Sequence, residues 1–202
     1  MKSLFIASAL ALAAAGSAQA ATNLVINGSF ESGTGGLGSF SGWQTQFGDA
    51  ATFVDSSGQT GNQPGQASSG LWSAYFGSTA ASGGATISQS LTTAPGQSYV
   101  LTFDLANDNA GQPAANAFVA RIDGQALFSF SQLPRQNYIH ETATFTAAGS
   151  SSLLSFFGSN DNGYLQLDNV AVTAVPEPLM ATQWLAGLLS LGLVLKRRAP
   201  RR

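Results

Sequence analysis

Apolar and polar residues alternate with a period of two in one segment after another between residues 23 and 173. Tyr99, Leu101 and Phe103, for example, would share one face of an extended chain, with Asp104 on the other face. Side chains of a β-strand point alternately to its two faces, so this pattern predicts half-buried strands. No segment of the same region has the period of an amphipathic helix. The alternation therefore restricts this part of the chain to an all-β fold.

Turn signals separate the alternating segments. Asp123-Gly124 is typical of a tight hairpin turn. About ten short strands with turns between them predict a β-sandwich. The 15 residues 56–70 are long for a loop in a compact domain, and we expect them to be flexible or functional. Strands are expected at residues 23–27, 51–55, 72–76, 87–91, 98–105, 118–123, 126–130, 139–146, 152–157 and 164–173.

The last of these segments changes phase. Leu165 and Leu167 fall on one face, whereas Val170 and Val172 continue with the other parity. One extra residue near Asp168 would return both pairs to the core, which predicts a β-bulge. Because a bulge re-aims side chains, Asp168 is expected to have a specific orientation.

The charge of the chain is unevenly distributed. Residues 21–175 hold two basic residues, Arg121 and Arg135, against nine acidic ones, so this region carries a net charge near −7. Such a surface repels phosphate backbones, and we expect no nucleic-acid partner. The chain has no cysteine, so its stability must come from core packing or from a bound metal.

The N-terminal residues 1–20 have the layout of a signal peptide. Lys2 precedes an apolar run over residues 4–15, and Ala18-Gln19-Ala20 gives a small-x-small cleavage site. We expect export through the Sec translocon and cleavage after Ala20. A permanent N-terminal anchor is the alternative.

The C-terminal residues 176–202 have three parts. Pro176-Glu177-Pro178 is followed by 17 uncharged residues, 179–195, and then by the basic residues 196–202. A helix over 179–195 would extend about 25 Å, just short of the hydrocarbon core, so a single marginal membrane span is expected. The basic cluster would stay in the cytoplasm, which places residues 21–175 on the other side of the membrane.

This order of elements resembles the PEP-CTERM sorting signal, with Pro176, Glu177 and Pro178 as the motif and Arg197 and Arg198 in the basic cluster. The resemblance implies processing by an exosortase-like membrane enzyme in a Gram-negative bacterium that makes exopolysaccharide. It also implies a final location at the cell surface or in the extracellular matrix. An ordinary C-terminal anchor is the alternative.

Three short motifs resemble the galactose-binding-like jelly rolls, which include carbohydrate-binding modules. They are Asn-Leu-Val-Ile-Asn-Gly-Ser-Phe-Glu at 23–31, Pro-Gly-Gln-Ser-Tyr-Val-Leu-Thr-Phe at 95–103 and Leu-Asp-Asn-Val-Ala-Val at 167–172. The resemblance implies a jelly-roll β-sandwich over residues 21–175. It also implies a structural Ca²⁺ ion bound by Glu31 and Asp168. Two carboxylates with backbone carbonyls suit calcium. The alternative is that both side chains accept hydrogen bonds in turns.

No catalytic constellation stands out. The chain has one histidine, His140, no cysteine and no G-x-S-x-G motif, so we expect no enzymatic activity. A hydrolase would need two facing carboxylates, and no spacing favours a particular pair. Trp43 and Trp72 are expected in the core. Carbohydrate contacts are expected instead from Tyr75, on the face opposite Trp72, and from the polar side chains of Asn107, Asn109 and Arg121.

Three hypotheses about function follow. The first is a non-enzymatic exported protein associated with exopolysaccharide or biofilm, with carbohydrate as its ligand. The second is a structural or adhesive matrix protein without a defined ligand, and the third is a polysaccharide hydrolase. Exposed aromatic side chains along a groove would favour the first, a uniformly polar surface the second, and two carboxylates facing each other in a cleft the third.

Overall fold

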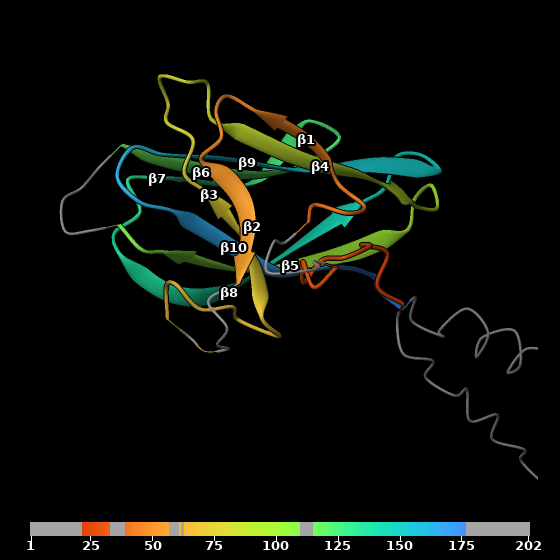
Figure 1. The fold of residues 1–202 in the computed structure, drawn as a ribbon. Coiled ribbons are helices and arrows are strands. Elements are labelled where there is room, and N and C mark those ends of the chain that lie inside the picture. The colour runs from red at the N-terminus through yellow and green to blue at the C-terminus, as the bar shows by residue number, and fades with distance from the viewer. Residues whose placement is uncertain (1–21, 33–38, 57–60, 62, 110–114, 177–202) are drawn as a thin grey trace, which may run out of the picture.

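Alternating side chains build two antiparallel sheets whose inner faces pack together. The structure, a computed structural model, describes residues 22–32, 39–56, 61, 63–109 and 115–176. Each sheet has five strands, and Figure 1 shows the two sheets as layers. In spatial order, the first sheet contains β1 (Gln44–Phe47), β4 (Ala85–Thr92), β9 (Ser151–Asn160), β6 (Asn116–Ile122) and β7 (Gln125–Ser131). The second contains β2 (Thr52–Ser56), β3 (Trp72–Phe76), β10 (Leu165–Ala174), β5 (Ser98–Asn107) and β8 (Gln136–Thr146).

Phenylalanine rings fill the space between the sheets. Phe103 of β5, Phe118 of β6 and Phe156 of β9 are fully buried. Their ring centroids lie 5.4 to 5.8 Å apart, with tilted or edge-on geometry. Such aromatic pairs add stabilisation beyond the area that they bury. The core is therefore an aromatic cluster to which both sheets contribute.

The all-β prediction is confirmed, and nine of the ten expected strands are present. The expected strand at residues 23–27 is wrong: Leu24 N donates to the carbonyl of Val172 in β10, but side chains bind the neighbouring amides and residues 26–27 form a turn. Asn23 Oδ1 accepts hydrogen bonds from the amides of Val25 and Val172, and Gln89 Oε1 accepts one from Ile26. The short edge strand β1, in turn, was not expected from the sequence.

Two local predictions are confirmed. Asp123 and Gly124 both have positive φ angles, 51° and 81°, and join β6 to β7 in a tight hairpin. The pairing of β10 with β5 shifts register between Asp168 and Ala171, which is the expected bulge. At the bulge Asn169 has a φ of 52°, a left-handed conformation that asparagine tolerates better than most residues. Leu165, Leu167, Val170 and Val172 are all buried as a result.

The chain ends lie largely outside the described residues. Residues 1–21 and 177–202 are not described, so the signal peptide, Glu177, Pro178, the helix over 179–195 and the tail with Arg197 and Arg198 remain predictions. Within the described ranges, no helix is long and apolar enough to cross a membrane. Pro176 lies two residues after Ala174, the last residue of β10.

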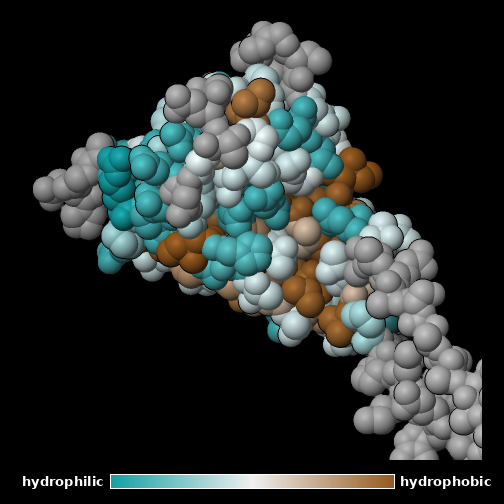
Figure 2. All heavy atoms as spheres, turned by 90° about the horizontal axis from the view of Figure 1, so that it is seen from below, coloured by the Kyte–Doolittle hydropathy of each residue, from teal (hydrophilic) through white to brown (hydrophobic). Residues whose placement is uncertain are grey.

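The surface mixes polar and apolar residues. Figure 2 shows hydrophilic and hydrophobic side chains interspersed over the face seen from below. The exposed large apolar side chains are Ile26, Phe47, Leu71, Ile139 and Leu153, which come from separate parts of the chain. Single exposed apolar residues of this kind are normal on soluble proteins.

We expect Phe103→Ala to lower the free energy of unfolding by about 3–5 kcal/mol, because it removes a buried ring and leaves a cavity. Urea denaturation of the purified protein measures this loss. Phe47→Ala, at an exposed position on β1, serves as the matched control and should change the free energy by less than about 1 kcal/mol. Equal losses for the two variants would contradict the aromatic-core account.

Candidate functional site

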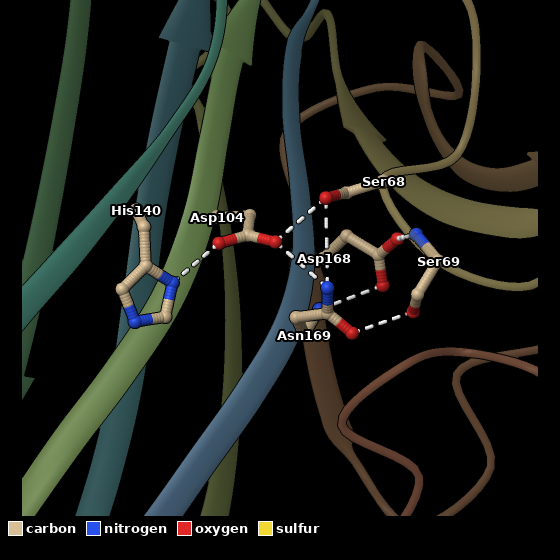
Figure 3. Close-up of polar contacts among 6 residues, drawn as sticks. All are labelled: Ser68, Ser69, Asp104, His140, Asp168 and Asn169. Atoms are coloured by element: carbon tan, nitrogen blue, oxygen red, sulfur yellow. Dashed lines mark hydrogen bonds and ion pairs between the residues drawn. The ribbon is translucent and has the colours of Figure 1, made fainter. Parts of the chain in front are cut away.

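Three titratable side chains lie in a row across three neighbouring strands on the outer face of the second sheet. His140 of β8 pairs in register with Asp104 of β5, and Asp104 pairs with Asp168 of β10. Leu105 and Leu167, which directly precede or follow the two aspartates in the chain, point into the hydrophobic core. Because side chains alternate along a strand, the three titratable side chains lie on the opposite face of the sheet. Figure 3 shows the row together with the segment that crosses it.

Asp104 is the centre of this cluster. Its Oδ1 lies 2.7 Å from His140 Nδ1, and its Oδ2 accepts hydrogen bonds from Ser68 Oγ at 2.6 Å and Asn169 Nδ2 at 2.7 Å. Burial disfavours the charged form, but these hydrogen bonds outweigh it and hold the pKa of Asp104 below its usual value. Asp104 is therefore a carboxylate that organises its neighbours.

Asp168 differs from Asp104, because it is completely buried. Its Oδ2 accepts a hydrogen bond from the amide of Ser69 at 2.9 Å, and its Oδ1 accepts one from the amide of Asn169 at 2.7 Å. Burial raises the pKa of Asp168 from 3.8 to about 7, and the nearby Asp104 charge acts in the same direction. Two carboxylates on adjacent strands thus have pKa values displaced in opposite directions.

Residues 63–70, which we call the strap, cross this face of the sheet. The strap lies in the long segment that the sequence singled out. At its start, Gly65 N donates to Gln166 Oε1 at 2.9 Å, and the carbonyl of Gln66 accepts a hydrogen bond from Tyr138. At its end, Ser68 and Ser69 bind the polar cluster (Figure 3). The strap is therefore fixed to β5, β8 and β10 through side chains.

An aromatic group flanks the strap on the same face. Phe53 of β2 stacks on Tyr75 of β3 with centroids 5.4 Å apart and an interplanar angle of 10°. Tyr164, just before β10, packs edge-on against both rings. The three rings cover one another, which leaves Tyr75 only 7% exposed.

A separate cleft of about 330 Å³ opens where the edge strands of the two sheets face each other. The apolar side chains of Ile122, Leu127 and Phe145 line it together with polar groups from both sheets. The polar lining residues are Asp123, Gln125, Thr144 and Thr146. Its volume lies near the lower end of the range for small-molecule sites, roughly 300–1,000 Å³.

The structure does not assemble the four residues expected to contact carbohydrate. Tyr75 lies opposite the core as expected, but its burial by Phe53 and Tyr164 corrects the expectation that it is exposed. Asn107 is fully buried, and its amide donates to the carbonyls of Leu133 and Pro134.

Asn109 is also buried, and its Oδ1 accepts a hydrogen bond from Asn162. Both asparagines thus hold loops together and are not free for a ligand. Arg121 lies on β6 in the other sheet, apart from the remaining three. The residues of the cleft were missed because they come from the edges of two sheets and form no motif in the sequence.

Glu31 and Asp168 approach the same segment from two sides. Glu31 Oε1 accepts hydrogen bonds from the amides of Leu71 and Trp72, directly after the strap, while Asp168 binds Ser69. Gly70 permits this approach, since its φ is 62° and a Cβ there would meet the Glu31 carboxyl group. In this arrangement both carboxylates accept hydrogen bonds from backbone amides, which is the alternative to a calcium site that the sequence left open.

The described residues contain no group of three or more His, Cys, Asp or Glu side chains that could hold a metal ion. Both oxygens of Asp168 and one of Glu31 already accept amide hydrogens. This donor set does not fit a calcium shell without rearrangement.

The polar cluster does not have the geometry of a nucleophilic triad. Ser68 and His140 both bind Asp104, so the carboxylate stands between them and no serine–histidine hydrogen bond joins them. Asp104 and Asp168 are directly opposed on neighbouring strands, and a pair of carboxylates is what a glycosidase would need. Asp168 is buried beneath the strap, however, and it does not face a cleft.

Comparisons with known proteins place the fold. Residues 23–173 match a family model described as "Protein of unknown function (DUF642)". No curated protein matches the sequence. Among solved structures, the carbohydrate-binding module TmCBM61 in complex with β-1,4-galactotriose is similar, with 13% identity, a TM-score of 0.50, and 76% of this chain and 99% of that chain covered.

The enzymatically active domain of bacteriophage CBA120 tailspike protein 4 has 18% identity and a TM-score of 0.50, but the match covers 76% of this chain and only 21% of that one. The CBM22-1 xylan-binding domain of Paenibacillus barcinonensis Xyn10C has 20% identity and a TM-score of 0.47, with 80% of this chain and 99% of that chain covered. At 13% and 18% identity, the similarity to the two structures with a TM-score of 0.50 shows the jelly-roll sandwich fold, as the sequence motifs implied, and no more.

The buried acid should make stability depend on pH. The folded state holds the Asp168 proton more tightly than the unfolded state, so its contribution is present below pH 3.8 and lost as the pH rises to about 7. This loss amounts to at most about 4 kcal/mol. We expect Asp168→Asn, which has no proton to lose, to gain stability relative to wild type between pH 4 and 7.

Urea unfolding at a series of pH values measures that difference, and other titrating groups largely cancel because both proteins share them. Asp55→Asn, at an exposed position, controls for the change in net charge. A wild type that gains stability over Asp168→Asn as the pH rises would contradict the account of Asp168.

Proposed function

The chain belongs to the DUF642 family, and from this premise we propose that it is a non-enzymatic carbohydrate-binding protein of the cell surface or extracellular matrix. The cleft between β7 and β8 is the observation that carries this proposal. A sugar ring offers apolar C–H faces and a rim of hydroxyl groups. A site that binds it therefore needs apolar side chains beside hydrogen-bonding ones.

The cleft has both kinds of group. Leu127 and Phe145 offer apolar surface, and the exposed Gln125 and Thr144 offer an amide and a hydroxyl group, each able to donate and accept hydrogen bonds. Asp123 supplies a carboxylate, one oxygen of which already accepts the amide hydrogen of Leu153. A similar sandwich, the carbohydrate-binding module TmCBM61, is described in complex with β-1,4-galactotriose, which supports carbohydrate as the class of ligand.

The charge of the protein favours a neutral glycan. Residues 21–175 carry nine acidic side chains and two arginines, and no basic residue lines the cleft. A glycan rich in uronic acids or sulfate would be repelled by this excess of negative charge, more strongly at low ionic strength.

The chain ends supply the route to the surface in this proposal. A signal peptide would direct export, and the Pro-Glu-Pro segment with its apolar and basic continuation would bring the protein to an exosortase-like enzyme before its release or attachment near exopolysaccharide. A structural or adhesive role without a ligand is the second candidate. It would be favoured if the cleft binds no glycan.

We expect the double variant Gln125→Ala/Thr144→Ala to weaken glycan binding about tenfold, because it removes two hydrogen-bonding groups of about 0.5–1.5 kcal/mol each. A screen of neutral oligosaccharides identifies a ligand, and equilibrium titration then gives the affinities. Gln44→Ala/Thr45→Ala makes the same changes at exposed positions on β1, at the opposite edge of the first sheet, and should bind as wild type does. Absence of binding to any neutral glycan, or equal losses in both variants, would refute the cleft as the site.

The sorting step has its own test. We expect the intact mass of protein recovered from its host to lack the residues from about Pro176 onward, and to retain them in a strain without its exosortase. Replacement of Pro176, Glu177 and Pro178 by alanine should block the loss of mass. An unprocessed tail in both strains would leave an ordinary membrane anchor as the explanation.

A further inference from the structure

The interface between the strap and the sheet contains a buried polar atom without a hydrogen-bond partner. It is Nε2 of Gln166 on β10, a residue that is completely buried. Gln166 points toward the strap, because its Oε1 accepts the hydrogen bond from Gly65. A buried donor without a partner is unfavourable, because it has lost its hydrogen bonds to water. Its presence indicates that this face has hydrogen-bonding capacity that the strap does not satisfy.

The strap contacts its sheet in the way that a sugar would. Ser68 presents a hydroxyl group to the Asp104 carboxylate, and Ser69 presents one to the side-chain oxygen of Asn169 at 2.5 Å. Two adjacent hydroxyl groups of a sugar could donate to one carboxylate and one amide oxygen in the same way. Figure 3 shows Ser68 and Ser69 approaching Asp104 and Asn169 from the same side.

The surroundings of these serines would suit a glycan. On one side His140, whose side chain is 60% exposed, connects the cluster to solvent. On the other side Gln166 pairs in register with Tyr75, a member of the aromatic group. The side chains that can bind sugar hydroxyls thus lie on adjacent strands of one sheet, between an open edge and a set of aromatic rings.

We propose that the strap occupies a second hydroxyl-binding site on the outer face of the second sheet, and that a neutral glycan binds there by displacing it. Ser68 and Ser69 stand in for the sugar hydroxyls in the free protein. Once the strap is displaced, the site would offer Asp104, Asn169 and Gln166 to the glycan. The unpartnered amide hydrogens of Gln166 would then gain sugar hydroxyls as acceptors. This inference rests on the proposed carbohydrate binding and adds a site that is closed by the protein's own chain.

The test compares Ser68→Ala/Ser69→Ala with wild type. The double variant loses the two competing hydroxyl groups but keeps the Ser69 amide that binds Asp168, so we expect it to bind glycan about tenfold more tightly. Ser129→Ala/Ser131→Ala on β7 is the matched control and should bind as wild type does. The full chain is used in a detergent without a sugar head group, with xylohexaose and β-1,4-galactotriose as probes.

Hydrogen exchange gives a second measurement that does not depend on the serine variant. In wild type, saturating probe should speed exchange at the amides of Gly65 and Ser69, while the amides of β5 stay protected. Tyr138→Phe, which removes the hydrogen bond between Tyr138 and the carbonyl of Gln66, should tighten binding in the same direction as the serine variant.

Equal affinities of the serine variant and wild type, or slower exchange in the strap with probe bound, would overturn this inference. If Gln125→Ala/Thr144→Ala still weakened binding in that case, the proposed cleft would stand without the second site. Absence of probe binding by every form would overturn both proposals together.

Discussion

The two sheets are held together by the packing of phenylalanine rings, and the rest of the structure depends on it. The chain has no cysteine to cross-link the sheets, so the rings of Phe103, Phe118 and Phe156 must set both their separation and their relative position. Because one face of each sheet is committed to this core, the polar chemistry is left to the outer faces and to the edges. Both candidate sites lie in those places.

The outer-face cluster shows how a buried polar layer can be kept on a sheet. Three side chains bind Asp104 and hold its pKa below the usual value, whereas burial raises the pKa of Asp168 to about 7. The strap is thereby fixed to three strands by hydrogen bonds rather than by an apolar surface. Hydrogen bonds of this kind can be exchanged for those of a ligand rich in hydroxyl groups, since the acceptors are the same.

Local sequence patterns correctly predicted those features of the fold that depend on neighbouring residues. The alternation of Tyr99, Leu101 and Phe103, the Asp123-Gly124 turn and the bulge beside Asp168 all depend on neighbouring residues, and the structure confirms each of them. The strand expected at residues 23–27 failed because the side chain of Gln89, far along the chain, takes one of its amides.

The candidate sites depend on contacts that no local pattern specifies. His140, Asp104 and Asp168 meet only because β8, β5 and β10 are neighbours in the sheet. Tyr75 is buried by the ring of Phe53 from β2 and by that of Tyr164 just before β10, and the alternation around Tyr75 gave no sign of either.

The most direct test of the central claim, that this sandwich binds carbohydrate with its own surface groups, is to map the contact by NMR. Backbone amide resonances would be followed while a neutral oligosaccharide is titrated into isotopically labelled protein. The account predicts saturable shifts that cluster at the cleft residues of β7 and β8 and at the strap. Shifts scattered over the surface without saturation, or confined to β1 and its neighbours, would contradict it.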